Sequence, residues 1–124
     1  MDTTLTRMML ISESLLVRFG FNIMIAKIFK SGFFIVGKAS YVNIALTYGL
    51  ENGFSVDILP NKEFAALTSD VAPFDFSRSP DWEEKLLIVL KSALKKNNAI
   101  GKKLRIKTKF REISSIQLHR LQQG

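Results

Sequence analysis

The chain has 124 residues, no cysteine, one histidine and a formal net charge of +7, and 47% of its residues are hydrophobic. This length suits one domain over residues 1–124, and the hydrophobic content excludes an intrinsically disordered chain. The lack of cysteine excludes disulfide scaffolds, cysteine nucleophiles and thiolate zinc sites, and a single histidine leaves little scope for imidazole metal sites.

The first thirty residues predict neither a signal peptide nor a membrane span. Asp2 stands where a signal peptide needs a basic segment, and the apolar stretch "MMLIS" is short. Arg18, Lys27 and Lys30 interrupt every window that approaches the ~20 apolar residues of a spanning helix. We therefore expect a cytoplasmic protein.

The N-terminal third predicts β structure. Apolar residues occupy every second position from Leu15 to Ile25, which is the period of a strand. Turn residues at 30–32 separate this run from a second β-rich run, so residues 21–37 are expected to form a hairpin. Residues 4–14 fit either a helix or a preceding strand.

The first main helix is predicted at about residues 40–51. Ser40 stands at the cap position, and the residues that follow at i, i+3, i+4 and i+7 spacing are Val42, Ala45, Leu46 and Gly49. Asn52 or Gly53 would end this helix in the left-handed conformation. Beyond it we expect a short strand that ends at Pro60, then one or two helical turns and a loop up to residue 80.

The second main helix is predicted at residues 80–97. Ser79 can cap it, Pro80 is tolerated at its first position, and three acids near its start complement the helix dipole, namely Asp81, Glu83 and Glu84. Trp82 is expected to anchor the helix in the core. The segment "NNAIG", residues 97–101, is expected to end the helix.

The segment "KKLRIKTKFR", residues 102–111, predicts a strand with a basic face because its cations alternate with less polar residues. Alternate side chains of a strand stand ~6.6 Å apart, which is close to the phosphate spacing of a nucleic-acid backbone. From Lys85 to the C-terminus there are eleven Lys or Arg residues and one acid, Glu112. This asymmetry predicts an anionic partner.

Together these elements predict an α+β fold. An antiparallel sheet would pack against the two main helices in a single small domain. The final residues, 112–124, fit either a last strand or a short helix.

Three motifs are too incomplete to predict catalysis. The segment "GFFIVGKA", residues 32–39, fits a phosphate-binding loop except that Ala39 replaces the required Ser or Thr. Glu83 and Lys85 match the acid-x-Lys pair of a metal-dependent nuclease, with Asp57 as a further acid, but they would lie ~200° apart on a helix. His119 has no acid or serine partner nearby in the sequence. We expect no enzyme, no metal and no cofactor, with a nuclease as the enzymatic alternative.

The favoured hypothesis is a small non-catalytic protein that binds the phosphate backbone of DNA or RNA. The predicted binding residues are Lys95, Lys96, Lys102, Lys103, Arg105, Lys107, Lys109, Arg111 and Arg120. One alternative is an interaction or inhibitor module that docks the same basic face on an acidic protein. Another is that the lysines protect the edge of a sheet from aggregation. A homodimer through the apolar N-terminal strands is also compatible with the sequence.

Overall fold

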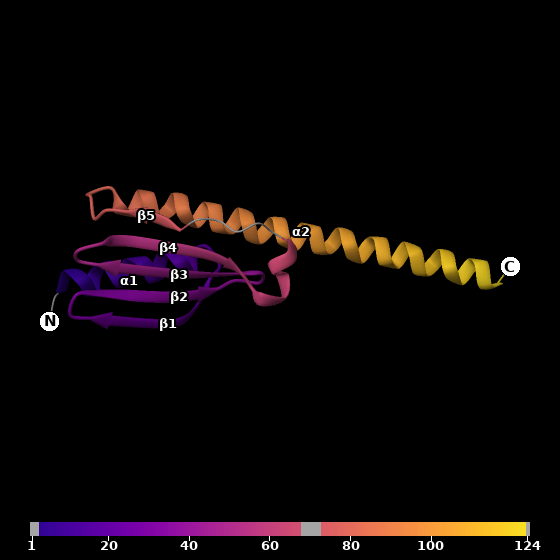
Figure 1. Cartoon of the computed structure of the whole chain (residues 1–124), viewed down its shortest axis with the longest axis horizontal. Helices are drawn as coiled ribbons and strands as arrows, with labels where there is room; N and C mark the ends of the chain where they lie inside the picture. The colour runs from indigo at the N-terminus through magenta and orange to yellow at the C-terminus, as the bar shows by residue number, and fades with distance from the viewer. Residues whose placement is uncertain (1–2, 68–72, 124) are drawn as a thin grey trace.

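The computed structural model describes residues 3–67 and 73–123, with side chains described up to residue 106. Five strands form one antiparallel sheet in the order of the sequence (Figure 1). The strands are β1 (Asn22–Phe29), β2 (Gly32–Lys38), β3 (Val42–Gly49), β4 (Gly53–Pro60) and β5 (Phe74–Phe76). The helices are α1 (Thr3–Arg18), the short 3-10 helix η1 (Lys62–Leu67) and α2 (Trp82–Gln123).

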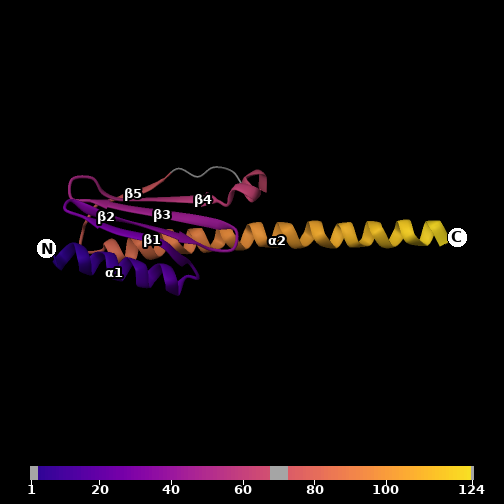
Figure 2. The same ribbon diagram turned by 90° about the horizontal axis from the view of Figure 1, so that it is seen from below.

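Both main helices cover the same face of the sheet, as Figure 2 shows. Helix α1 packs on β1 and β2, whereas α2 packs on β3, β4 and β5. The C-terminal part of α2 continues past the end of the sheet (Figure 1). This two-layer arrangement in one small domain confirms the predicted α+β fold with an antiparallel sheet and two main helices.

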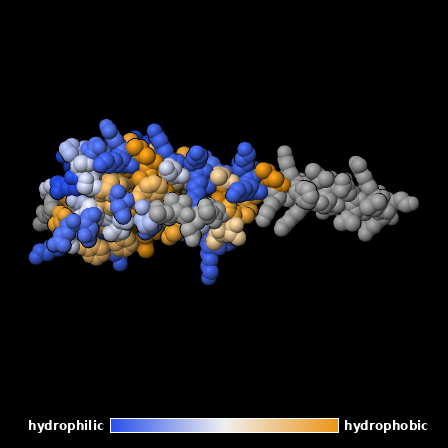
Figure 3. Space-filling model, turned by 45° about the horizontal axis from the view of Figure 1, so that its top comes forward, coloured by the Kyte–Doolittle hydropathy of each residue, from blue (hydrophilic) through white to orange (hydrophobic). Residues whose placement is uncertain are grey.

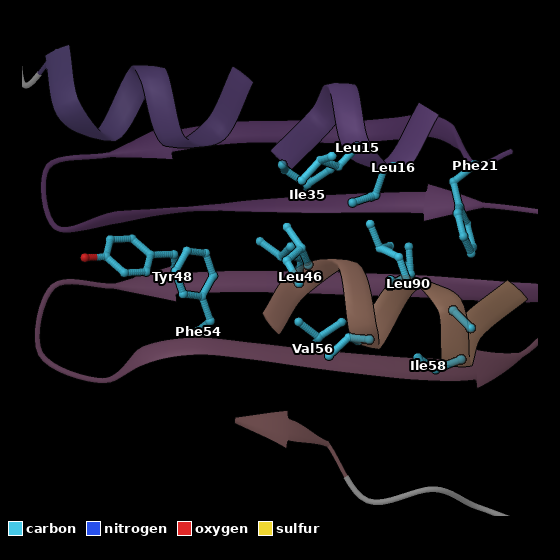
Figure 4. Close-up of a cluster of buried hydrophobic side chains, with 14 of the residues drawn as sticks. Leu15, Leu16, Phe21, Ile35, Leu46, Tyr48, Phe54, Val56, Ile58 and Leu90 are labelled. Carbon is cyan, nitrogen blue, oxygen red and sulfur yellow. The ribbon is translucent and has the colours of Figure 1, made fainter. Parts of the chain in front are cut away.

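The core lies between the sheet and the two helices (Figure 4). Alternate residues of each central strand point toward the helices, as the pleat of a strand requires. On β3 these residues are Val42, Ile44, Leu46 and Tyr48, and all four are buried. Helix α1 contributes Leu15 and Leu16 from one side, and α2 contributes Leu90 from the other.

Residues 4–14, for which the sequence left two possibilities, belong to α1. The buried residues of this helix recur at spacings of three, four and one, which places them on one face: Leu5, Met8, Ser12, Leu15 and Leu16. Ser12 Oγ donates a hydrogen bond of 2.8 Å to the Met8 carbonyl, which satisfies its buried hydroxyl. The predicted strand therefore begins too early, because residues 15–18 are helical and β1 starts only at Asn22.

The predicted hairpin at residues 21–37 is confirmed. Strands β1 and β2 pair antiparallel, with Phe29 opposite Gly32 at the turn. The register shifts by one residue between Ile23 and Ile25, so Met24 is the extra residue of a β-bulge.

The predicted helix at about 40–51 is wrong, because residues 42–49 form strand β3. Val42 and Leu46 fit both a helical spacing of four and a strand spacing of two, so a short window does not separate the two periods. The β-branched and aromatic residues at 42, 44 and 48 favour a strand. The left-handed residue was predicted correctly, since Gly53 has φ +73°, but it closes the β3–β4 hairpin instead of ending a helix.

The segment between β3 and α2 follows its prediction more closely. The short strand that ends at Pro60 is β4, and the expected helical turns are η1. The expected loop up to residue 80 contains strand β5, which pairs with β4 at Phe54–Phe76 and two further positions. Residues 68–72 of this loop lie outside the described residues.

The start of the second main helix is confirmed, but its predicted end is wrong. Trp82 is buried and stacks on Phe54, with ring centroids 5.1 Å apart. Ser79 Oγ hydrogen-bonds the Asp81 carboxylate just before the first turn. Instead of ending at residue 97 and yielding to a strand at 102–111, the chain stays helical to Gln123.

The helix continues because its predicted breakers are used in tertiary contacts. Asn97 Oδ1 accepts a hydrogen bond of 2.8 Å from the Tyr41 backbone N–H. Gly101 faces the Tyr41 ring, and a Cβ at this position would lie 2.7 Å from Tyr41 Cε2. The same ring packs edge-on against Phe64 of η1, with centroids 5.2 Å apart. The β2–β3 loop and η1 therefore hold α2 at the point where it leaves the sheet.

Candidate anion-binding surface

The exposed face of α2 carries a row of cations that we call the basic stripe, consisting of Lys91, Lys95, Lys102 and Arg105. At 100° per residue these four positions fall within an arc of about 80°. The buried residues of the helix lie on the opposite side: Trp82, Leu86, Val89, Leu90, Ala93 and Ile100. Because the core holds one side of the helix, the basic stripe is turned outward.

All four residues of the basic stripe are exposed. With a rise of 1.5 Å per residue, the stripe extends about 21 Å from Lys91 to Arg105. Figure 3 shows hydrophilic side chains around the stretch where α2 leaves the sheet, beside a few hydrophobic ones.

The basic stripe has no acid beside it along the helix. No Asp or Glu occurs between Lys85 and Glu112 in the sequence. At the start of the helix, Lys85 Nζ lies 3.8 Å from Oδ1 of Asp81, the residue just before α2. The positive potential of the four stripe residues is therefore not cancelled by neighbours on α2, which favours an anionic ligand.

The predicted site residues separate once the segment is helical. Two positions on a helix differ by ~200°, so Lys103 and Arg105 do not share a face as they would on a strand. Lys103 Nζ instead donates a hydrogen bond of 2.7 Å to the Leu67 carbonyl at the end of η1. Lys96 is half-buried and has an interaction of its own, so it is not a free cation.

Three predicted residues, Lys95, Lys102 and Arg105, are thus brought onto one exposed face. The side chains of Lys107, Lys109, Arg111 and Arg120 lie outside the described residues, although the backbone of α2 is helical there. Lys91 is a member of the stripe that the sequence prediction did not include. The spacing of 4, 7 and 3 residues from Lys91 to Arg105 is helical, so it would have revealed this residue.

Two of the three motifs considered for catalysis do not form the sites they suggested, and the side chain of the third, His119, lies outside the described residues. The segment fitting a phosphate-binding loop is strand β2 followed by a turn into β3. Asp57 alternates with the buried residues Val56 and Ile58, so it lies on the face of the sheet away from the helices. Glu83 lies on α2, which covers the other face. In the part of the chain that the structure describes, no three acidic or histidine side chains gather as a metal site would require.

Comparisons of the chain with protein families, curated proteins and solved structures gave no match. None of the helices, as far as they are described, is long and apolar enough to cross a membrane.

Proposed function

We propose that this protein binds the phosphate backbone of nucleic acid through the basic stripe of α2. The observation that carries the proposal is the alignment of four exposed cations along about 21 Å of one helix face, opposite the core. This replaces the basic strand of the sequence-based hypothesis with a basic helix. The proposal keeps a non-catalytic role and the cytoplasmic location expected from the sequence.

The shape of α2 supports contact with a duplex. A helix with its side chains is ~10–12 Å wide, which matches the ~12 Å width of the major groove of B-DNA. Since α2 extends beyond the sheet (Figure 1), part of it is free of the body of the domain. Four lysine or arginine contacts to phosphates would bind with little sequence preference and with a strong dependence on salt.

The affinity should therefore fall steeply with ionic strength. Four neutralised phosphates predict a slope of about −3.6 for log K against log salt on duplex DNA. Fluorescence anisotropy with a labelled duplex of about 20 base pairs, titrated at several salt concentrations, measures this slope. The same titration with single-stranded DNA and double-stranded RNA compares the possible nucleic-acid ligands.

A matched pair of charge-reversal variants distinguishes the effect of a local site on affinity from the effect of the net charge of the protein. The stripe variant carries Lys91→Glu, Lys95→Glu and Lys102→Glu. The control variant carries the same change at three exposed lysines outside α2, namely Lys30, Lys38 and Lys62. Each variant lowers the formal charge from +7 to +1. We expect the stripe variant to lose binding and the control variant to retain most of it.

Two outcomes would contradict the proposal. One is the absence of binding by the unaltered protein at low salt. The other is an equal loss in both triple variants, which would show that only net charge matters. The alternative ligand is an acidic protein. It would be favoured over nucleic acid if a purified acidic protein bound the unaltered protein in a one-to-one ratio and did not bind the stripe variant.

A further inference from the structure

Strand β1 is an edge of the sheet with an exposed apolar surface. Among the described strands it pairs with β2 and with no other strand, so its outer backbone N–H and C=O groups have no sheet partner. Four of its side chains are apolar and 39–59% exposed, and they form what we call the β1 edge patch: Met24, Ile25, Ile28 and Phe29. An edge of this kind is a template for pairing with another strand.

The other edge of the sheet does not offer the same surface. Strand β5 has three residues, whereas β1 has eight. The protection of β1 consists of one charge, Lys27, and the bulge at Met24. From Ile25 to Phe29 the strand is in regular register with β2, so most of its outer edge has the regular geometry of a strand.

We propose that a second copy of this chain pairs with β1, antiparallel and about a two-fold axis, to form a continuous ten-stranded sheet. A two-fold interface needs a surface that complements itself, and an antiparallel strand pair meets this condition directly. This inference goes beyond the proposed function and does not depend on it.

Charge selects the register of this pairing. Residues that face each other across two strands must lie on the same face of the sheet. Placing Lys27 on the axis would set two lysines directly opposite each other, which is unfavourable. Placing Ala26 on the axis sets Ile25 opposite the partner subunit's Lys27 and Ile28 opposite the partner subunit's Met24. This second register pairs Ile28 with the bulge residue Met24 and avoids the like charges.

The position of α1 fits the same dimer. Helix α1 packs over β1 and β2, so its axis lies about half a strand spacing inside β1. With strands ~4.8 Å apart, the two α1 helices would lie about 10 Å apart across the axis, which is the ordinary packing distance of helices.

The area suits a weak interface. The four exposed apolar residues of β1 are about half exposed, so at ~180 Å² per large side chain they offer about 350 Å² per copy. The strand edge itself adds to this figure, and the sum stays below the ~800 Å² per partner of a standard interface.

Opposite substitutions at residue 25 test both the dimer and its register. Ile25→Lys would face the partner subunit's Lys27 twice, once on each side of the axis, whereas Ile25→Glu would form two favourable pairs there. We expect the dimer dissociation constant of the lysine variant to be at least about tenfold higher than that of the glutamate variant. Sedimentation equilibrium over a dilution series measures both constants. The same two substitutions at Leu59, which is 52% exposed on β4, are the control and should leave dimerisation unchanged.

Cysteine crosslinking gives an independent readout, because the natural chain contains no cysteine. With Ala26 on the axis, Ala26→Cys places two thiols within the Cα separation of a disulfide. We expect rapid oxidation to a covalent dimer, and no such product from Thr47→Cys on the central strand β3.

Three results would overturn the inference. The first is that the natural protein is still monomeric at roughly 100 µM, which we take as the highest dissociation constant of a meaningful dimer. The second is that the two Ile25 variants have equal dissociation constants. The third is that residues 26 and 47 crosslink equally. None of them bears on nucleic-acid binding, which is measured separately with the stripe variant.

In the dimer both α2 helices lie on the same face of the sheet, because the two-fold axis is perpendicular to it.

Discussion

Replacement of Phe54 by alanine is expected to destabilise the fold more than any surface change. Phe54 is fully buried and stacks between Trp82 and Phe76, with ring centroids at 5.1 Å and 4.8 Å. It also contacts Tyr48 at 4.7 Å and Phe33 at 6.4 Å. This one side chain therefore joins four strands to the first turn of α2.

The magnitude follows from its surroundings. Removal of a buried phenylalanine side chain costs ~3–5 kcal/mol, and each aromatic pair adds ~0.5–1.5 kcal/mol beyond its buried area. Since two stacked partners are lost, we expect the upper part of the first range, about 4–5 kcal/mol. That is a large fraction of the ~5–15 kcal/mol that stabilises a typical domain. Phe54→Leu, which keeps most of the volume, should cost about 1–3 kcal/mol and remain folded.

Urea unfolding measures these losses. Trp82 is the single tryptophan of the chain and lies against Phe54, so its fluorescence reports directly on this contact, and circular dichroism reports on the helices. Leu50→Ala is the control, because Leu50 is 51% exposed and its removal should cost less than about 1 kcal/mol. The reasoning is refuted if Phe54→Ala lowers the free energy of unfolding no more than Leu50→Ala, when both variants show the same slope of that free energy against urea concentration.

Four further substitutions test local features of the fold. Gly53→Ala should cost about 1–3 kcal/mol in urea unfolding, because residue 53 has φ +73° and its Cβ would lie 2.7 Å from a β5 carbonyl oxygen. Gly20→Ala, with φ +90° but no atom within 4 Å, should cost less, and the reverse order would contradict the steric argument. Asn97→Ala should cost about 1–2 kcal/mol by leaving a backbone N–H of the β2–β3 loop without its 2.8 Å acceptor, and an unchanged midpoint would argue against this contact. The hydrogen bond from Ser79 lowers the pKa of Asp81 below 3.8, so its contribution to stability is present above 3.8 and is lost as the pH falls through the lowered value. Asp81→Asn should remove this acid-dependent component, and parallel acid unfolding of both proteins would contradict it.

Local sequence patterns predicted the β1–β2 hairpin, the left-handed residue of the β3–β4 turn and the start of α2. The turn at residues 30–32 and the left-handed Gly53 mark the β1–β2 and β3–β4 connections, and both are set by backbone chemistry that neighbouring residues determine. Ser79 and the acids after it likewise mark a helix start that depends only on local hydrogen bonds and charge.

The same patterns failed where one residue set fits two periods. Val42 and Leu46 suit a helix and a strand equally, and burial of β3 against α2 selects the strand. At residues 102–111 the alternating cations suggested a strand, but lysine, leucine and arginine are also good helix formers, so the helix already begun at Trp82 continues through them.

The candidate surface shows the same division. Composition and charge by themselves established that residues 85–124 are strongly basic, with eleven Lys or Arg residues and one acid. Which of those cations share a face depends on whether the backbone advances by 180° or by 100° per residue. That choice was made by tertiary contacts, because Asn97 and Gly101, which end helices in isolation, here receive the Tyr41 N–H and the Tyr41 ring.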